Sequence, residues 1–448
     1  MCGVIGICSK SNVSTSLFYG MNSLQHRGQE AAGMAVYDGE EIRRTRSMGL
    51  VIDAFTEEKL RELPGTIGIG HVRYATASGS HDYNIQPLMG FIGGEMIALA
   101  SDGNLVNYQI LRERLEEEGM MFQTTSDTEV ILYLITRYYD GDIVEAIKKT
   151  MKVIRGAYSV TALVKDKVVA FRDPHGFRPF VLGRDGDDVI VASENAAIEI
   201  IGGEMTRNVE AGEILVIDGT GIHSDRFESE ATARNCIFEY VYFARNDATL
   251  DDINAYTFRR RCGEILWEEA PCDVDLVVPV PDSGIPSAIG YAQAAGIPYG
   301  EGLVKNRYMG RTFIKPTQKE REMAVKLKLN PLVDVVKGKS IVLLDDSIVR
   351  GTTSRNLIKR LRDAGAREVH MRITSPPVAY SCYYGIDTPN RKNLIAANQS
   401  IQEIEENIGA DSLAFISLEG LAKAGKKDVS EYCTACFDGD YPVDPTLI

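Results

Sequence analysis

The segment SIVLLDDSIVRGTTSRNLIKRLRDAGA, residues 340–366, determines the fold expected for the second half of the chain. Its apolar residues 341–344 predict a buried strand, and Asp345 and Asp346 follow at the carboxyl end of that strand. A short loop containing Gly351 then leads into a helical pattern that ends at the next glycine. Working outward, the apolar run DLVVPVP and further helical patterns repeat this alternation. The alternation indicates βαβ units and a parallel sheet.

The loop after this strand has the composition of a phosphate site. Ligands of open α/β sheets bind outside the carboxyl ends of the strands, and the free N–H groups of a helix N-terminus suit a phosphate. Two adjacent carboxylates suit ribose hydroxyls or Mg²⁺, because hard oxygen ligands match that ion. The alternative is an ordinary strand–loop–helix unit with a solvated acidic pair.

The whole segment resembles the phosphoribosyl pyrophosphate (PRPP) motif of type I phosphoribosyltransferases. The resemblance implies that Asp345 and Asp346 contact the ribose diol and Mg²⁺. It implies that the 5-phosphate is held by Arg350, Gly351, Thr352 and Thr353. A second strand–loop segment, VVPVPDSGIPSA, is similar to the family's pyrophosphate loop and implies that Ser283 lies near the pyrophosphate and the metal.

A basic segment interrupts an otherwise acidic chain, whose formal net charge is −14. It begins LVKNRYMGRTFIKP, and the usual interpretation of such a segment is a solvated surface loop. It resembles the mobile loop of the glutamine PRPP amidotransferases, which implies that Lys305, Arg307 and Arg311 hold the diphosphate leaving group.

The first half of the chain begins with a candidate nucleophile. Cys2 follows the initiator Met, whose removal we expect, with no other segment to be cleaved. A free α-amine titrates near ~8, so the amine and the thiol of one residue can act as base and nucleophile together. By itself a cysteine at this position is weak evidence.

Five motifs strengthen this interpretation: MCGVIGI, LQHRGQEAAG, GIGHVRYAT, DGNLVN and TTSDTEV, in this order. Together they resemble the N-terminal-nucleophile (Ntn) glutaminase domain of class II amidotransferases. The resemblance implies that Cys2 attacks the glutamine amide and that Gly103 donates its N–H to the oxyanion. It also implies that Arg73 binds the α-carboxylate and Asp127 the α-ammonium of glutamine. A structural ion pair is the alternative for Arg73 and Asp127.

One position departs from the family pattern, which has an Asn immediately before that glycine. Here it is Asp102. An ionised carboxylate only accepts hydrogen bonds, and loss of one oxyanion donor typically costs roughly 10²–10³ in kcat. A protonated Asp102 would donate, which requires burial. An ammonia-dependent phosphoribosyltransferase with an impaired glutaminase domain is therefore an alternative function.

Four of the eight cysteines form a third candidate site: Cys236, Cys382, Cys433 and Cys436. Four thiolates suit tetrahedral zinc or an iron–sulfur cluster, and an empty reduced site is a further alternative. The positions resemble the branch of the glutamine PRPP amidotransferases that carries a structural 4Fe–4S cluster, which is the interpretation we favour.

The resemblance extends from Cys2 to about Pro442. It implies an α+β Ntn sandwich domain over residues 2–230, followed by an α/β parallel-sheet type I phosphoribosyltransferase domain over residues 231–448. It implies glutamine-dependent amination of C1 of PRPP, which yields 5-phosphoribosylamine and opens de novo purine synthesis. Family members are usually homotetramers inhibited by purine nucleotides.

Composition limits the remaining function classes. The acidic charge argues against nucleic acid as a partner, and no apolar run approaches the ~18 residues of a membrane span. The N-terminus lacks the blocks of a secretory signal, so we expect a cytoplasmic protein. A non-enzyme alternative is a PRPP- or nucleotide-sensing regulator, against which the absence of a recognisable helix-turn-helix argues.

Overall fold

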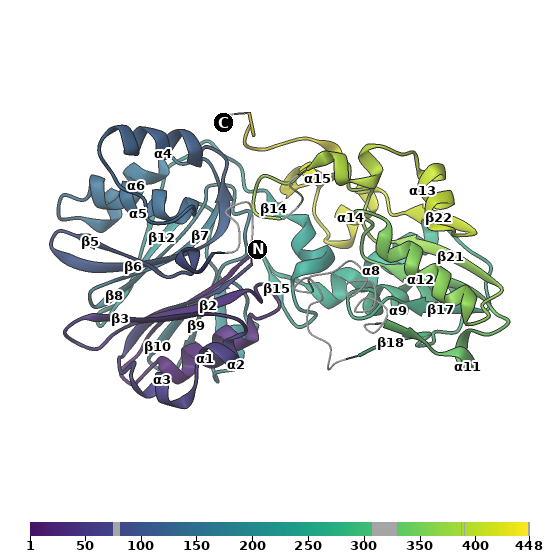
Figure 1. Ribbon diagram of the computed structural model, residues 1–448, viewed down its shortest axis with the longest axis horizontal. Coiled ribbons are helices and arrows are strands. Elements are labelled where there is room, and N and C mark those ends of the chain that lie inside the picture. Colours follow the sequence, from purple (N-terminus) through teal and green to yellow (C-terminus); the bar gives the residue numbers. More distant parts are fainter. Residues whose placement is uncertain (75–80, 307–328, 387, 389, 447–448) are drawn as a thin grey trace.

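The computed structural model describes residues 1–74, 81–306, 329–386, 388 and 390–446. These residues form two lobes that meet near the N-terminus, which lies at the centre of the picture (Figure 1). No helix among the described residues is both long enough and apolar enough to span a membrane.

The first lobe contains two stacked antiparallel sheets. One has the order β11-β9-β10-β1-β4-β2-β3 and the other β13-β12-β8-β7-β6-β5. The first sheet consists of β1 (Gly3–Cys8), β2 (Ala31–Tyr37), β3 (Ile42–Met48), β4 (Ile67–Arg73), β9 (Val181–Asp185), β10 (Asp188–Ala192) and β11 (Glu204–Asn208). The second consists of β5 (Leu88–Ile92), β6 (Glu95–Leu105), β7 (Gly156–Val164), β8 (Lys167–Arg172), β12 (Glu213–Asp218) and β13 (Gly221–Arg226).

Helices cover the outer face of each sheet, which gives four layers (Figure 1). The first sheet carries α1 (Ser14–Ser23), α2 (Val51–Ala54), α3 (Glu57–Arg61) and α7 (Ala196–Glu199), and the second carries α4 (Tyr108–Glu117), α5 (Asp127–Tyr138) and α6 (Ile143–Met151). An apolar core that includes Val4, Ile69 and Val168 fills the space between the sheets. Because both faces of each sheet are covered, a central strand such as β1 is buried along its whole length.

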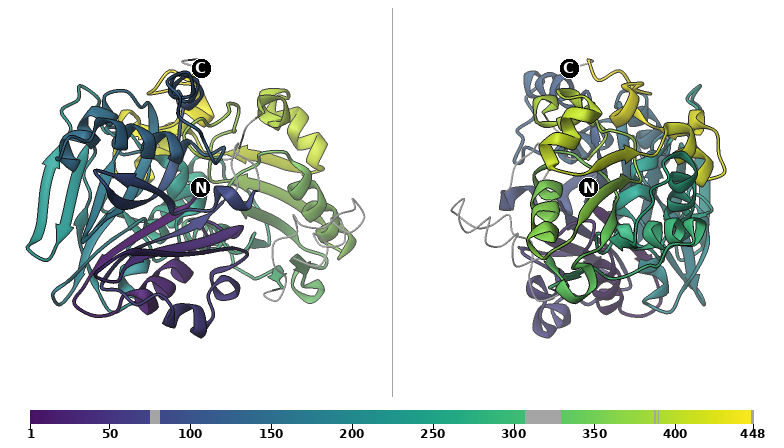
Figure 2. Two further views of the ribbon diagram at one scale, coloured as in Figure 1. Left: turned by 60° about the vertical axis from the view of Figure 1, so that its left-hand side comes forward. Right: turned by 90° about the vertical axis from the view of Figure 1, so that its right-hand side faces the viewer.

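The second lobe contains a parallel sheet of order β17-β20-β21-β22. Its strands are β17 (Leu276–Pro279), β20 (Ser340–Asp345), β21 (Glu368–Ile373) and β22 (Ser412–Phe415). Alternate residues of β20 face opposite ways: Val342 belongs to the core beneath α8 (Ala255–Glu269), α9 (Gly284–Ala295) and α14 (Leu418–Ala424). Leu343 packs with α11 (Val333–Val336), α12 (Thr352–Asp363) and α13 (Ile401–Ile408). The two helical layers lie on either side of the sheet (Figure 2).

Short elements complete the two lobes. They are η1 (Asp82–Asn84), β14 (Asn235–Cys236), η2 (Glu239–Phe243), β15 (Thr249–Leu250), β16 (Ile253–Asn254), β18 (Leu303–Lys305), β19 (Leu329–Pro331), η4 (Arg391–Asn393), η5 (Ile395–Ala397), η6 (Val429–Glu431), β23 (Tyr432–Cys433) and α15 (Ala435–Asp438). The pair β14–β23 is parallel and aligns Cys236 with Cys433.

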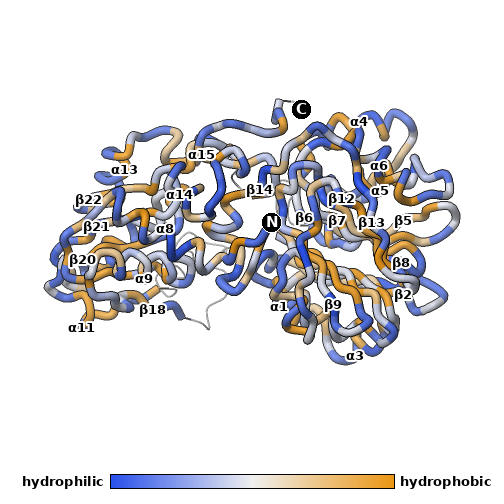
Figure 3. Tube along the Cα trace, turned by 180° about the vertical axis from the view of Figure 1, so that it is seen from behind, coloured by the Kyte–Doolittle hydropathy of each residue, from blue (hydrophilic) through white to orange (hydrophobic). Residues whose placement is uncertain are grey.

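The predicted fold class is confirmed: a layered α+β sandwich is followed by an α/β unit with a parallel sheet. Helix α5 begins directly after Ser126, whose Oγ accepts a hydrogen bond from the Thr128 N–H. Hydrophobic stretches follow the strands of both lobes, including β9 and β20, as the alternating pattern predicted (Figure 3). The domain boundary expected after residue 230 lies in the segment between β13 and β14.

Candidate active site

Cys2 lies immediately before β1, in the interior of the protein. Its backbone N–H donates to Asp102 Oδ1 at 2.8 Å, and its Sγ lies 3.8 Å from the carbonyl oxygen of Tyr74. Burial raises the pKa of the Cys2 thiol. Met1 precedes it, is itself 1% exposed, and accepts a contact at Sδ from Arg178. The candidate nucleophile Cys2 is therefore buried beside Met1, Tyr74 and Asp102.

Arg27 is the centre of a buried ionic network around Cys2. Its Nε donates to the Cys2 carbonyl oxygen at 2.8 Å, and its Nη2 donates to Asp102 Oδ2 at 3.0 Å. Its guanidinium also donates to Glu194 Oε1 at 2.7 Å and to Glu239 Oε1 at 2.9 Å. All four charged side chains are almost completely buried, and the network therefore fixes the backbone of the candidate nucleophile, Cys2.

Arg178 connects this network to the second lobe. Its Nη1 donates to Glu239 Oε1 at 3.2 Å, and its Nη2 donates to the carbonyl oxygen of Tyr384 at 2.6 Å. Because Glu239 also accepts from Arg27, one carboxylate joins the two guanidinium groups.

The residues predicted to bind glutamine lie at the end of a strand and at the start of a helix. Arg73 ends β4, next to Tyr74, and its Nη1 lies 3.1 Å from Glu30 Oε2. Asp127 begins α5, and its Oδ2 accepts from the Leu105 N–H at 2.9 Å. Burial raises the pKa of the Asp127 carboxyl. The structural ion pair considered for Arg73 therefore exists, with Glu30 as its partner rather than Asp127.

Gly103 occupies a position that only glycine fits. Its φ is +142°, and a Cβ added there would come within 2.0 Å of the Ala157 carbonyl oxygen. The strand β6 thus presents the Gly103 backbone, rather than a side chain, beside Asp102 and Cys2.

The second lobe contributes to this surface. A Cβ added to Gly385 would lie 3.2 Å from the Gly103 carbonyl carbon, and Asn104 Nδ2 donates to the Tyr383 carbonyl oxygen at 2.9 Å. Residues far along the chain thereby close one side of the candidate glutaminase site.

The predicted PRPP loop connects β20 to α12. Asp345 and Asp346 are buried side by side at the carboxyl end of β20. Burial, and then the neighbouring Asp346, raise the pKa of Asp345 well above its ordinary value, and burial also raises that of Asp346. Within the described part of the chain, no salt bridge reaches either carboxylate. This concentrated negative charge suits a divalent cation or a diol.

The amino end of α12 completes the loop. Gly351 has φ +73° and precedes Thr352 and Thr353, which begin the helix. No side chain caps this helix. Arg350 is exposed just before it. The amino end of α12 therefore combines free helix N–H groups, the hydroxyls of Thr352 and Thr353, and the nearby Arg350 guanidinium.

The pyrophosphate-loop residues lie against this site. Ser283 Oγ donates to Asp346 Oδ2 at 2.5 Å, and Lys305 Nζ is paired with Asp282. Arg307 and Arg311 lie outside the described residues.

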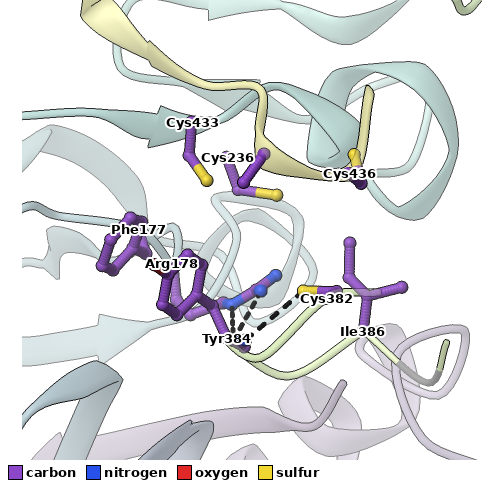
Figure 4. Close-up of a pocket in the computed structure, with 9 residues that line it drawn as sticks. Phe177, Arg178, Cys236, Cys382, Tyr384, Ile386, Cys433 and Cys436 are labelled. Atoms are coloured by element: carbon purple, nitrogen blue, oxygen red, sulfur yellow. Dashed lines mark hydrogen bonds between the residues drawn. The ribbon is translucent and has the colours of Figure 1, made fainter. Parts of the chain in front are cut away.

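The four predicted cysteine ligands line one pocket between the lobes (Figure 4). The other lining residues are Phe177, Arg178, Tyr384, Ile386 and Ala435. All eight cysteines are free thiols. Burial raises the pKa of Cys236 to about 11, and those of Cys433 and Cys436 well above their ordinary value. In the described ranges, no group of three or more His, Cys, Asp or Glu side chains is arranged to hold a metal ion.

Comparison with known proteins identifies the family. Residues 71–199 match the model of a glutamine amidotransferase domain. The amidophosphoribosyltransferase of Methanothermobacter thermautotrophicus is 48% identical over 446 residues, which cover 98% of this chain and 94% of that protein. The chain belongs to the amidophosphoribosyltransferase family. It is a transferase with a glutamine amidotransferase domain.

Solved structures support the same assignment. The glutamine PRPP amidotransferase of B. subtilis, complexed with ADP and GMP, superimposes with a TM-score of 0.94 at 44% identity and covers 99% of this chain and 98% of that one. A structure described as the allosteric regulatory enzyme of purine biosynthesis also has a TM-score of 0.94, at 45% identity, with 99% and 96% coverage. The resemblance to the amidophosphoribosyltransferase family is therefore confirmed over almost the whole chain.

Sequence reasoning did not single out the ionic network of this amidophosphoribosyltransferase family member. Arg27 falls within the quoted LQHRGQEAAG motif, but its partners lie 75, 167 and 212 positions away along the chain. Arg178 and Glu239 stand in no local pattern that distinguishes them from surface charges. Their function as a buried network follows only from the meeting of the lobes.

Proposed function

We propose that this protein transfers nitrogen from the amide of glutamine to C1 of PRPP, with water consumed and glutamate, pyrophosphate and 5-phosphoribosylamine formed. This is the first committed step of de novo purine synthesis. The observation that carries the proposal is the contact of Gly385 with Gly103, because it joins the phosphoribosyltransferase lobe to the glutaminase nucleophile site in one chain.

The glutaminase half-reaction begins at Cys2. After Met1 is removed, the Cys2 α-amine takes the thiol proton and the sulfur attacks the amide carbon of glutamine. The Gly103 N–H stabilises the oxyanion, while Arg73 and Asp127 hold the α-carboxylate and α-ammonium. The C–N bond then breaks, the amine returns a proton to the departing ammonia, and water hydrolyses the thioester to glutamate.

Glu30 supports the assignment of Arg73. It forms an ion pair with Arg73 at 3.1 Å, and so keeps the guanidinium at the end of β4 before a carboxylate ligand arrives. A bidentate guanidinium–carboxylate contact gives both energy and orientation.

The transferase half-reaction takes place at the β20–α12 loop. The 5-phosphate is held by Arg350, Gly351, Thr352 and Thr353, and the ribose hydroxyls by Asp345 and Asp346. Lys305, with Arg307 and Arg311, neutralises the departing pyrophosphate. As the C1–O bond to pyrophosphate breaks, the lone pair of ammonia forms the C1–N bond, and the protein contributes positioning and charge stabilisation.

Mg²⁺ fits the residues at this loop. The adjacent buried carboxylates and the Ser283 hydroxyl provide hard oxygen ligands. Burial raises the pKa values of Asp345 and Asp346, so a bound cation would offset the cost of ionising them. Asp345, Asp346 and Ser283 would hold the ion, which supplies positive charge to the pyrophosphate oxygens when bound.

A 4Fe–4S cluster suits the four cysteines of this pocket by ligand type, although the described side chains are not arranged as ligands of a metal ion. Free thiols from three segments of the chain line this pocket, and the buried Arg178 guanidinium adds positive charge beside ligands that must bind as thiolates. Cys236, Cys382, Cys433 and Cys436 would hold the cluster, which would cross-link these segments without taking part in the reaction.

The remaining parts of the proposal are regulatory and cellular. The B. subtilis relative was solved with ADP and GMP, and we extend nucleotide binding to this chain, with purine nucleotides as inhibitors. A homotetrameric assembly and a cytoplasmic location complete the proposal and rest on the sequence resemblance and composition.

Asp102 favours one alternative, an ammonia-dependent transferase, because both its carboxylate oxygens are already bound and neither is an oxyanion donor. The deciding experiment supplies anaerobically purified protein with PRPP and Mg²⁺, and with glutamine or ammonium as nitrogen donor. Comparable rates with the two donors support the full reaction. Activity with ammonium alone supports the ammonia-dependent alternative. If PRPP is consumed with neither glutamine nor ammonium, both proposed functions are contradicted.

A further inference from the structure

Asp102 occupies a position where the family resemblance implies an Asn, and it is completely buried. Oδ1 accepts from the Cys2 N–H at 2.8 Å, and Oδ2 accepts from Arg27 Nη2 at 3.0 Å. Both oxygens are therefore directed at groups that stabilise an ionised carboxylate. A protonated Asp102 would need an acceptor, whereas both of these partners are donors.

The charges around Asp102 are unequal in number. Three buried carboxylates, Asp102, Glu194 and Glu239, contact two buried guanidinium groups, Arg27 and Arg178. One negative charge is left over in the interior. A buried charge is costly unless it is paired, so this set favours one further proton or cation.

Two groups are in position to supply that charge. His26 Nε2 lies 2.8 Å from Glu194 Oε1, but the His26 side chain is 25% exposed and contacts Glu194 rather than Asp102. The Cys2 nitrogen contacts Asp102 itself and is buried. Once Met1 is removed, this nitrogen becomes an α-amine that can carry the proton.

The other titratable and charged groups near Cys2 do not supply it. His71 on β4 is buried, and desolvation and then Arg73 lower its pKa to about 3, so it is neutral. Arg73 on the same strand is paired with Glu30. Among the residues that the structure describes, the Cys2 thiol is the other titratable group beside the amine, and burial disfavours its ionised form.

We propose that Asp102 is a positioning residue that accepts a hydrogen bond from the α-amine of processed Cys2 and, fixed by Arg27, retains a proton on that amine. This inference rests on the proposed glutaminase function. The ammonium cannot act as a base until it gives its proton to solvent. Glutamine hydrolysis therefore starts from a protonated resting state and increases as pH rises through the deprotonation of Cys2.

The substitution Asp102→Asn separates this function from that of an oxyanion donor. The variant removes one negative charge and leaves two carboxylates facing two guanidinium groups, so the proton on Cys2 loses its stabilisation. An opposite charge at this distance raises the pKa of an amine by ~1 unit or more. We expect the acid limb of kcat/KM for glutamine hydrolysis to move down by about one pH unit in the variant. Any gain from an added oxyanion donor raises the plateau and leaves the midpoint unchanged.

Glu194→Gln is the matched control. It removes an equally buried carboxylate that contacts the same guanidinium but does not contact the Cys2 nitrogen. We expect a shift of less than half that of Asp102→Asn. Intact mass establishes whether Met1 is removed, and ammonium-dependent activity with PRPP shows that each variant is folded.

A second measurement does not depend on turnover. The rate at which iodoacetamide alkylates Cys2, followed by peptide mass across the pH range, should also shift to lower pH in Asp102→Asn, because a nearby negative charge raises the pKa of thiol and amine alike. Equal midpoints in wild type and variant would overturn the inference, as would retention of Met1. A shifted alkylation midpoint without glutamine hydrolysis at any pH would support the inference and contradict the proposed glutaminase.

Discussion

Gly385, in the second lobe, lies directly against Gly103, in the first: a Cβ on Gly385 would sit 3.2 Å from the Gly103 carbonyl carbon and 3.3 Å from its Cα. The same segment accepts hydrogen bonds from Asn104 and Arg178 through the carbonyl oxygens of Tyr383 and Tyr384. The backbone around the candidate oxyanion donor is therefore braced by a segment that also contains Cys382.

Gly385→Ala should uncouple the two activities. The added Cβ meets the Gly103 backbone, and φ of +116° strains any L-residue, so the segment must move away from Gly103. A misplacement of ~1 Å can cost about 10²-fold in a positioned reaction, and a smaller shift costs less. We expect glutamine-dependent activity to fall by roughly 10–10², while ammonium-dependent activity with PRPP is retained.

Gly338→Ala controls for strain alone. Gly338 also has a positive φ, +74°, but a Cβ there meets nothing within 4 Å. Equal losses of glutamine-dependent activity in the two variants would show that contact with Gly103 is irrelevant.

Arg73→Lys should weaken glutamine binding selectively. Lysine keeps the charge but loses the planar fork that binds a carboxylate through two hydrogen bonds. We expect KM for glutamine to rise about 10–10²-fold, with the ammonium-dependent rate unchanged. Steady-state kinetics with both donors provides the measurement, and Cys2→Ser gives the zero level of glutamine use. A lower kcat at unchanged KM would refute the assignment.

Asp346→Asn should change both catalysis and the pH dependence of stability. Because burial raises the folded-state pKa of Asp346, the folded protein binds more protons than the unfolded chain between the two pKa values, and stability falls as pH rises through that interval. Without metal, we expect the variant to melt higher than wild type near neutral pH, by on the order of 2 °C, with the difference vanishing in acid.

Mg²⁺ should reverse the order of the melting temperatures of wild type and Asp346→Asn. Bound to the native state alone, it raises the melting temperature of wild type, and the variant should respond little and lose activity with both nitrogen donors. Asp363→Asn, which alters an exposed carboxylate paired with Lys359 on α12, should leave the Mg²⁺ response intact. A normal Mg²⁺ response in Asp346→Asn would exclude this carboxylate as a ligand.

Cys436→Ser should abolish the cofactor proposed for the cysteine pocket. One ligand of four is lost, so iron and sulfide measured on anaerobically purified protein should fall far below the wild-type content. Since the segment with Cys382 braces Gly103, we also expect a lower melting temperature. Cys272→Ser, at a half-buried cysteine outside the pocket, is the control and should keep its iron. Stoichiometric zinc in the wild-type protein would contradict the proposed cluster and indicate a zinc site instead.

Local sequence determined much of this protein. The β20–α12 unit follows from apolar periodicity and a loop glycine, both of which act over a few residues. The chemistry of Cys2, Asp345 and Asp346 likewise came from residue type and neighbours in the chain. Interactions within one strand, turn or helix leave such a local record.

Only the tertiary structure determined how these parts act together. Arg27 meets Asp102, Glu194 and Glu239 across as many as 212 positions, and no local pattern marks such partners. The same holds for Glu30 beside Arg73, a pairing that no local sequence pattern indicated. The effect of a departure from the family pattern, such as Asp102, depends on its burial and on the hydrogen-bond donors that face it. The reason is that the energy of a charge depends on what surrounds it in space.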